Sequence, residues 1–174
     1  MAVESAETQI ATLPSVVITD LDGRTHHLTE LVGQHACVIA FVCNHCPYVR
    51  WIESELGRIA RDFPEVAFVA INSNDVDAYP DDDVDGMRDQ LQRADWSFPY
   101  LRDRDQSAAR TFGAVCTPDF FVFSADGALM YRGAMDNSRP SQDAPVNGAY
   151  LRAALAGSPV AGRPSLGCGI KWLG

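Results

Sequence analysis

The sequence predicts an α/β fold in which helices flank a central mixed β-sheet, and three observations carry this prediction. Two short apolar runs, at 36–42 and 66–71, are rich in β-branched residues, as buried parallel strands are. Between them, residues 48–61 carry apolar side chains at helical spacing, so the three segments form a right-handed crossover. Near residues 120–132, two further strands joined by a tight turn are expected to pair antiparallel, which makes the sheet mixed.

The remaining elements follow from local patterns along the chain. A strand at 16–18 leads into a turn at 20–23, and one helical turn is expected at 28–31. Beyond the crossover we expect a helix at 84–94, an extended segment at 97–101, a short helix at 106–112, strands at 120–123 and 129–132, and a last helix at 146–156. Gly113 is expected to end the short helix.

Nothing in the sequence divides the chain into separate domains. Its 174 residues suit one domain with a full core, and we find no internal repeat or low-complexity linker. We therefore expect a single domain over residues 1–174, with an N-terminal extension before the first strand. Residues 158–174 are rich in Gly and Pro and are expected to form a flexible C-terminal tail.

Charge and hydropathy argue against two classes of partner. The net charge of -9 disfavours electrostatic binding to nucleic acid or to an anionic membrane. No stretch approaches the ~20 consecutive apolar residues that a transmembrane helix needs. We therefore expect neither a nucleic-acid partner nor a membrane partner.

The opening residues and the cysteines indicate a cellular compartment. Residues 1–7 carry acids where a secretory signal peptide carries lysine or arginine, and no apolar core of signal length follows. We therefore expect a cytoplasmic protein, in which dithiols stay mostly reduced and a Cys-x-x-Cys pair is catalytic rather than structural. The chain has 5 cysteines at irregular spacing, which also argues against a secreted disulfide scaffold.

The motif Cys43-Asn44-His45-Cys46-Pro47 lies where the first buried strand meets the long helix. Two cysteines so spaced at a helix start either close a small disulfide ring or stand as two thiols. The helix N-terminus stabilises a nearby anion, so one thiol is expected to lose its proton easily. The thiolate is the form that attacks disulfides and peroxides, and the motif therefore predicts a redox site.

Four segments together resemble the thioredoxin-like redoxins, the group that includes thioredoxin-like reductases, TlpA-like proteins and the AhpC/TSA peroxiredoxins. The matching segments are Phe41–Pro47, Ser97–Asp103, Thr117–Phe123 and Asp126–Gly133. The runs Cys-Asn-His-Cys-Pro-Tyr, Thr-Pro-Asp-Phe-Phe and Gly-Cys-Gly-Ile-Lys-Trp are more closely similar to one bacterial subgroup. The resemblance, which extends from Leu13 to Leu155, implies a thioredoxin-like fold.

The resemblance implies a role for each residue of the motif and for a second loop. Cys43 is expected to attack the substrate and to be the more exposed thiol, whereas Cys46 faces inward and resolves the mixed disulfide. His45 is expected to tune the pKa of the attacking thiol, because its charged form favours a thiolate; the alternative is an exposed histidine without effect. Thr117-Pro118 matches the loop that faces the cysteine pair in thioredoxin folds, where the proline is cis. Its backbone groups are expected to pair with an extended substrate.

For each of two further cysteines, the sequence leaves two possible roles open. Cys116, two residues before Pro118, is either a third redox thiol or a small residue that fits the loop. Cys168, between two glycines of the tail, either resolves or relays a disulfide or has no role. Free exposed cysteines are usually avoided, which favours a role for Cys168.

One role known from thioredoxin is left unfilled. There, a buried acid six residues before the first cysteine assists proton transfer, and the matching residue here is Cys37. Glu53, Glu55 and Asp119 are candidates for this role.

Other acids crowd one segment without following the calcium-loop pattern, and we expect them to form a solvated loop. These acids are Asp75, Asp77, Asp81, Asp82, Asp83 and Asp85.

The leading functional prediction is a thiol-disulfide oxidoreductase that needs no cofactor. Its expected partners are a protein or small-molecule disulfide as substrate and a cytosolic thiol as reductant. The alternative is a peroxiredoxin-like peroxidase in which Cys46, followed by Pro47, is the peroxidatic cysteine; Cys116 and Thr117 stand where peroxiredoxins carry an arginine, which counts against it. A weaker hypothesis is a zinc site with four thiolate ligands, Cys43, Cys46, Cys116 and Cys168.

Overall fold

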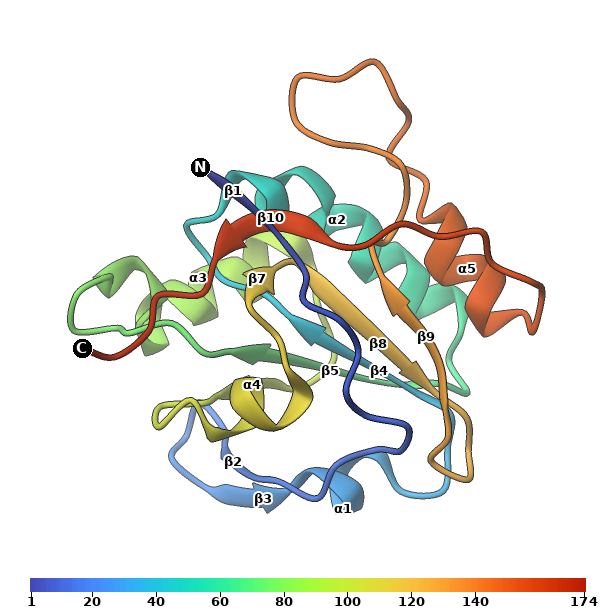
Figure 1. Ribbon diagram of the computed structural model, residues 1–174. Helices are drawn as coiled ribbons and strands as arrows, with labels where there is room; N and C mark the ends of the chain where they lie inside the picture. The colour runs from blue at the N-terminus through green and yellow to red at the C-terminus, as the bar shows by residue number, and fades with distance from the viewer.

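A seven-stranded mixed sheet lies at the centre of the computed structural model, which describes residues 1–174 (Figure 1). Its strands are β2 (Val17–Thr19), β3 (Thr25–His27), β4 (Cys37–Phe41), β5 (Ala67–Asn72), β6 (Tyr100–Arg102), β8 (Asp119–Phe123) and β9 (Leu129–Gly133). They lie in the order β3-β2-β6-β5-β4-β8-β9. Strands β4, β5 and β6 run parallel, whereas β8, β9, β2 and β3 pair antiparallel, so the expected mixed sheet is confirmed.

Helices cover both faces of this sheet, as Figure 1 shows. On one face lie α2 (Pro47–Asp62), α3 (Val84–Ala94) and α5 (Ala149–Leu155), and on the other lie α1 (Leu28–Val32) and α4 (Ser107–Phe112). Side chains alternate along β4, so that Val38 and Ala40 face the first set of helices and Ile39 faces the second. Every residue of β4 is buried, which explains its continuous apolar sequence. None of the helices is both long enough and apolar enough to cross a membrane.

The crossover from β4 through α2 to β5 sets the position of the cysteine motif. Strands β4 and β5 pair in parallel register from Cys37 opposite Ala67 to Phe41 opposite Ile71. Helix α2 begins at Pro47, whose missing N–H costs little in the first turn. The motif therefore lies between the carboxyl end of a central strand and the N-terminus of a helix.

The last helix is shorter than predicted, because it begins at Ala149 rather than at residue 146. Gly148 has a φ of 64°, a left-handed conformation that ends the preceding loop. The carboxylate of Asp136 accepts hydrogen bonds from the backbone N–H groups of Asn147 and Gly148, which fixes this loop. The helical pattern of apolar residues extends back to residue 146, but the helix itself begins only at Ala149.

The C-terminal tail is ordered, and the expectation that it is flexible is wrong. Strand β10 (Leu166–Gly169) pairs antiparallel with β1 (Ala2–Glu4) on one side and with β7 (Cys116–Thr117) on the other, in a second sheet. Figure 1 shows this segment in red, crossing the molecule beside β7. The Gly and Pro content of the tail predicts a loop. Pairing with β1 and β7, which lie elsewhere in the chain, stabilises a strand here despite that local preference.

A buried ion pair fixes the start of β10. Asp119 accepts hydrogen bonds from Nη2 of Arg132 and from Oγ of Ser165, each at 2.8 Å. Burial raises the pKa of Asp119, and the bonds from Arg132 and Ser165 oppose this rise. The carbonyl of Ser165 also accepts the N–H of Ser5, so the ion pair joins β8, β9 and both terminal segments.

Candidate active site

The fold brings the cysteine motif against the loop that contains Pro118. The Thr117–Pro118 peptide bond is cis, as the sequence resemblance implied. Sγ of Cys43 lies 3.4 Å from Oγ1 of Thr117, and Sγ of Cys46 lies 3.5 Å from the carbonyl oxygen of Thr117. The structure therefore places four of the residues singled out in the sequence in one site.

Both cysteines of the motif are sealed from solvent. Cys43 and Cys46 are each 0% exposed, so the expectation that Cys43 is the more exposed thiol is wrong. Thr117 of β7 contacts both sulfurs, and Cys168 of β10 packs against the apolar cluster that contains them. Nε2 of Gln90, from α3, donates to the carbonyl of Cys43. The sequence did not indicate this cover, because it comes from the tail.

The electrostatics of the two thiols favour Cys46 over Cys43 as the thiolate. The interaction with the Cys43 thiol is the largest cause that lowers the pKa of Cys46, to about 5. The same interaction, burial and the negative charge of Asp82 raise the pKa of Cys43. The side chain and N–H of Cys168 and the N–H of Val49 also lower the pKa of Cys46, whereas burial opposes this shift. Cys46 is therefore the candidate thiolate.

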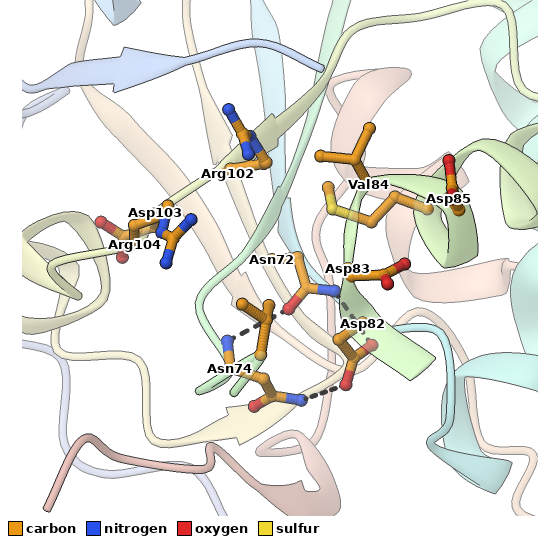
Figure 2. A pocket seen from close by; sticks show the side chains of 11 residues that line it. Asn72, Asn74, Asp82, Asp83, Val84, Asp85, Arg102, Asp103 and Arg104 are labelled. Atoms are coloured by element: carbon orange, nitrogen blue, oxygen red, sulfur yellow. Dashed lines mark hydrogen bonds between the residues drawn. The ribbon is translucent and has the colours of Figure 1, made fainter. Parts of the chain in front are cut away.

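The buried acid of the site is Asp82, at the end of the short 3-10 helix η1 (Pro80–Asp82). Its side chain is fully buried and accepts the backbone N–H of Asn44 at 2.6 Å. Nδ2 of Asn72 and Nδ2 of Asn74 each donate to it at 3.0 Å, as Figure 2 shows. The prediction of a solvated loop is therefore wrong for Asp82, although Asp81, Asp83 and Asp85 are exposed.

A polar cavity of about 220 Å³ lies beside Asp82 (Figure 2). Its walls also include Asn72, Asn74, Arg102 and Arg104. The volume is sufficient for several water molecules, and the side chains offer them hydrogen-bond partners. Asp82 therefore lies between the thiols and a space through which protons can exchange.

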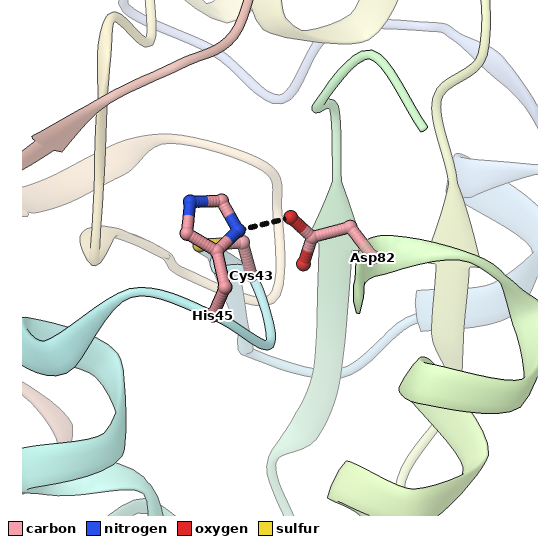
Figure 3. Close-up of side chains that lie close together, drawn as sticks. All are labelled: Cys43, His45 and Asp82. Atoms are coloured by element: carbon pink, nitrogen blue, oxygen red, sulfur yellow. Dashed lines mark hydrogen bonds and ion pairs between the residues drawn. The ribbon is translucent and has the colours of Figure 1, made fainter. Parts of the chain in front are cut away.

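His45 joins the motif to the same acid. Its Nδ1 lies 2.5 Å from Oδ2 of Asp82, and its ring stacks on Tyr79 with the centroids 5.6 Å apart. Figure 3 shows a nitrogen of the His45 ring directed at Asp82, with the sulfur of Cys43 behind the ring in this view. The carboxylate therefore holds the ring beside the Cys43 thiol, and the tuning role expected of His45 stays a prediction.

The three acids proposed from the sequence for the buried role lie elsewhere. Glu53 pairs with Arg93, Glu55 pairs with Arg58 and Arg152, and Asp119 pairs with Arg132. One signal for Asp82 was present in the sequence: Gly86, inside the predicted helix at 84–94. A Cβ at Gly86 would lie 2.1 Å from the carbonyl oxygen of Asp81, so this glycine lets the acidic turn fold back over the helix.

The two auxiliary cysteines differ in their surroundings. Cys116 is buried, its S–H points to the carbonyl of Ser165 at 4.0 Å, and burial raises its pKa. Cys168 lies in β10 opposite Thr117 and is only partly buried. Of the two, Cys168 is therefore the one that contacts the candidate thiolate.

The site does not bring together the four thiolates that the zinc hypothesis requires. The metal-ligating side chains whose ligand atoms lie within 4.8 Å of one another are Cys43, His45 and Asp82. The carboxylate of Asp82 already accepts four hydrogen bonds, from His45, Asn72, Asn74 and the backbone of Asn44. A cation would have to displace several of them.

The low pKa of Cys46 predicts the titration of the reduced protein. The thiolate is present at neutral pH, and it is lost as the pH falls through about 5. Replacing Cys43 by alanine removes the largest cause of the lowered value, so the midpoint should rise toward the ~8.5 of a free thiol. The ultraviolet absorbance of the thiolate, measured against pH, reports both midpoints.

Cys116→Ala is the matched control, because this buried cysteine donates no hydrogen bond to Cys46. Its midpoint should equal that of the unaltered protein. A midpoint near ~8.5 in the unaltered protein would contradict the assignment of the thiolate.

Solved structures similar to this chain support the fold. An uncharacterized conserved protein from Geobacillus kaustophilus is 41% identical, with a TM-score of 0.91 over 99% of this chain and 97% of that one. A hypothetical protein from Sinorhizobium meliloti 1021 is 36% identical, with a TM-score of 0.90 over 98% of both chains. A secreted disulfide oxidoreductase from Mycobacterium tuberculosis is 21% identical, with a TM-score of 0.65 over 82% of this chain and 96% of that one, and shows the fold alone.

A family model places the chain in a defined group. The model of the AhpC/TSA family matches residues 11–132, which include the cysteine motif, Asp82 and the cis-proline loop. A comparison with curated proteins found no match. Family and fold together support a redox function of the thioredoxin-like kind. The chain belongs to the AhpC/TSA family and has the thioredoxin-like fold.

Proposed function

We propose that this protein is a thiol-disulfide oxidoreductase that alternates between a Cys43/Cys46 dithiol and a Cys43–Cys46 disulfide. The observation that carries the proposal is that both motif sulfurs contact Thr117 of the Pro118 loop, Cys43 at 3.4 Å and Cys46 at 3.5 Å. Exchange of a disulfide requires a thiolate and a second thiol within bonding reach of it. Membership of the AhpC/TSA family supports the same class of chemistry.

In the proposed reaction, the Cys46 thiolate attacks one sulfur of a disulfide that reaches it when β10 leaves the edge of the Thr117-Pro118 loop. A bond forms between the two sulfurs, and the other half of the substrate leaves as a thiolate. Cys43 then loses its proton and attacks the Cys46 sulfur, which releases the second half as a thiolate. The order reverses the roles that the sequence resemblance implied, and the lowered pKa of Cys46 supports this reversal.

Asp82 supports the second step as a proton acceptor for Cys43. The sulfur of Cys43, a ring nitrogen of His45 and a carboxylate oxygen of Asp82 lie within 4.8 Å of one another. In the mixed disulfide Cys46 has lost its charge, so the largest cause that raises the pKa of Cys43 is gone. The proton then passes to Asp82 and from there to the adjacent cavity, which fills the role that Cys37 leaves open.

The proposal predicts different failures for the two cysteines. Cys46→Ser should abolish reduction of a small-molecule disulfide in a single turnover, because it removes the attacking thiolate. Cys43→Ser should release only the first half of the substrate and keep the second half attached to Cys46, which mass spectrometry of the intact protein detects. Cys116→Ala should behave as the unaltered protein. A substrate adduct that forms on Cys43 of the Cys46→Ser protein at the unaltered rate would contradict the proposed roles.

Asp82→Asn should slow the release of the second half of the substrate at neutral pH and make its rate rise with pH, because solvent must take the proton. Asp81→Asn, an exposed neighbour, is the matched control. Removing the charge of Asp82 also lowers the pKa of Cys43, which by itself speeds this step. A slower step therefore identifies Asp82 as the acceptor, and an equal or faster one contradicts that role. Rapid-quench measurement of the mixed disulfide follows the step.

One observation favours a peroxidase as a second candidate, namely the lowered pKa of Cys46 before Pro47. Peroxide would convert the Cys46 thiolate to a sulfenic acid and release hydroxide, after which Cys43 would displace a second hydroxide and form the disulfide. Against this candidate, the nearby arginines Arg50 and Arg93 donate hydrogen bonds to Asn44, so these groups are not free to bind peroxide. We expect stopped-flow oxidation by hydrogen peroxide to be no faster than that of free cysteine; a much faster reaction would favour the peroxidase.

A further inference from the structure

Three sulfurs form a path from the interior to the surface. Cys43 and Cys46 are 0% exposed, whereas Cys168 is partly exposed. Cys168 packs against the apolar cluster that contains both motif cysteines, and it lies opposite Thr117, whose carbonyl oxygen is 3.5 Å from the sulfur of Cys46. Cys46 therefore lies between a buried thiol and one that solvent reaches.

Strand β10 occupies the edge of the cis-proline loop, where an extended substrate would pair. Cys168 lies opposite Thr117, and Gly169 lies opposite Cys116, in antiparallel register. A Cβ at Gly167 would lie 1.8 Å from the carbonyl oxygen of Thr117, so only glycine permits this approach. Strand addition at an open edge is a common mode of peptide binding, and here the chain's own tail fills the edge.

Contacts on both sides of Cys168 hold it in this register. On one side, Ser165 is bound to the buried carboxylate of Asp119. On the other, the N–H of Lys171 donates to Oδ1 of Asn74 at 2.8 Å. Asn74 also donates to Asp82, so the tail is bound to the hydrogen-bond network of the active site itself. The contact between Cys168 and Cys46 is therefore a consequence of the fold.

We propose that Cys168 is a third redox thiol, which exchanges with the Cys43–Cys46 disulfide and presents a Cys46–Cys168 disulfide to an external thiol reductant. The inference rests on the proposed function and adds the point at which the reductant enters. The Cys168 thiolate attacks the Cys46 sulfur, and Cys43 leaves as a thiolate and takes up a proton. A reductant thiolate then attacks the Cys168 sulfur and releases the Cys46 thiolate. A second reductant thiol frees Cys168, so two electrons pass from the reductant to the protein.

The charges around the three sulfurs suit this order of steps. In the reduced protein, burial and the hydrogen bond to the Cys46 thiolate raise the pKa of Cys168 to about 12. When Cys46 is part of a disulfide its charge is absent, so that part of the rise disappears, and the positive charge of Lys171 still favours the Cys168 thiolate. Cys46, with a pKa of about 5, is a good leaving group when the reductant attacks Cys168.

The first test traps the new bond. The full-length Cys43→Ala protein, oxidised with diamide and blocked under acid, should contain an intramolecular Cys46–Cys168 disulfide, identified by peptide mass spectrometry. The Cys43→Ala/Cys116→Ala protein should give the same bond. If Cys46 instead remains free or forms only dimers and adducts, the inference is wrong.

The second test measures the reductive step. Oxidised Cys168→Ser protein should be reduced by dithiothreitol about tenfold more slowly than the unaltered protein, because the buried disulfide has lost its exposed partner. Serine keeps a hydroxyl donor toward Cys46, so the change reports the missing thiol. Gly174→Ala, a terminal residue with no neighbour within 4 Å, is the control and should not change the rate. Equal or faster reduction of Cys168→Ser would overturn the inference.

The two tests distinguish the failure of this inference from failure of the proposed function. If the unaltered protein forms a Cys43–Cys46 disulfide and reduces a substrate, but Cys168→Ser is reduced at the same rate, only the role of Cys168 fails. If the unaltered protein forms no Cys43–Cys46 disulfide and shows no turnover, the proposed function itself fails.

Discussion

The close pairing of β10 with the cis-proline loop is the contact on which the arrangement of the site depends. It covers Cys43 and Cys46, directs the thiol and N–H of Cys168 to the Cys46 sulfur, and is possible only because Gly167 has no side chain. The buried bond from Ser165 to Asp119 holds one end of this strand against the main sheet. The tail is therefore part of the candidate active site as well as of the fold.

The surroundings of the two motif cysteines favour a negative charge on Cys46 and disfavour one on Cys43. The helix N-terminus and several sulfur-directed donors stabilise the thiolate of Cys46, whereas the carboxylate of Asp82 disfavours a second negative charge on Cys43. Such electrostatics favour one thiolate and one protonated thiol in the reduced pair. The position of Asp82 on η1, rather than on β4, explains how Cys37 can be a plain apolar residue of that strand.

The sequence predicted the parts of the site whose signals are local. The crossover at 36–71, the Cys-x-x-Cys motif and the Thr117-Pro118 loop each carry their own pattern, and the fold brings them together. It did not predict Asp82, because burial of one acid among several exposed ones depends on Asn72, Asn74 and the backbone of Asn44. It also missed β10, since pairing with β1 and β7 cannot be read from a segment rich in Gly and Pro.

Hydrogen–deuterium exchange of the backbone amides tests the docking of the tail most directly. In the reduced protein the N–H of Cys168 points to the Cys46 sulfur, and the N–H of Ile170 donates to the carbonyl of Val115. The account predicts that both amides exchange as slowly as those of the central strand β4, since each is bonded within the fold. Exchange of these two amides at the rate of an unstructured chain would contradict it.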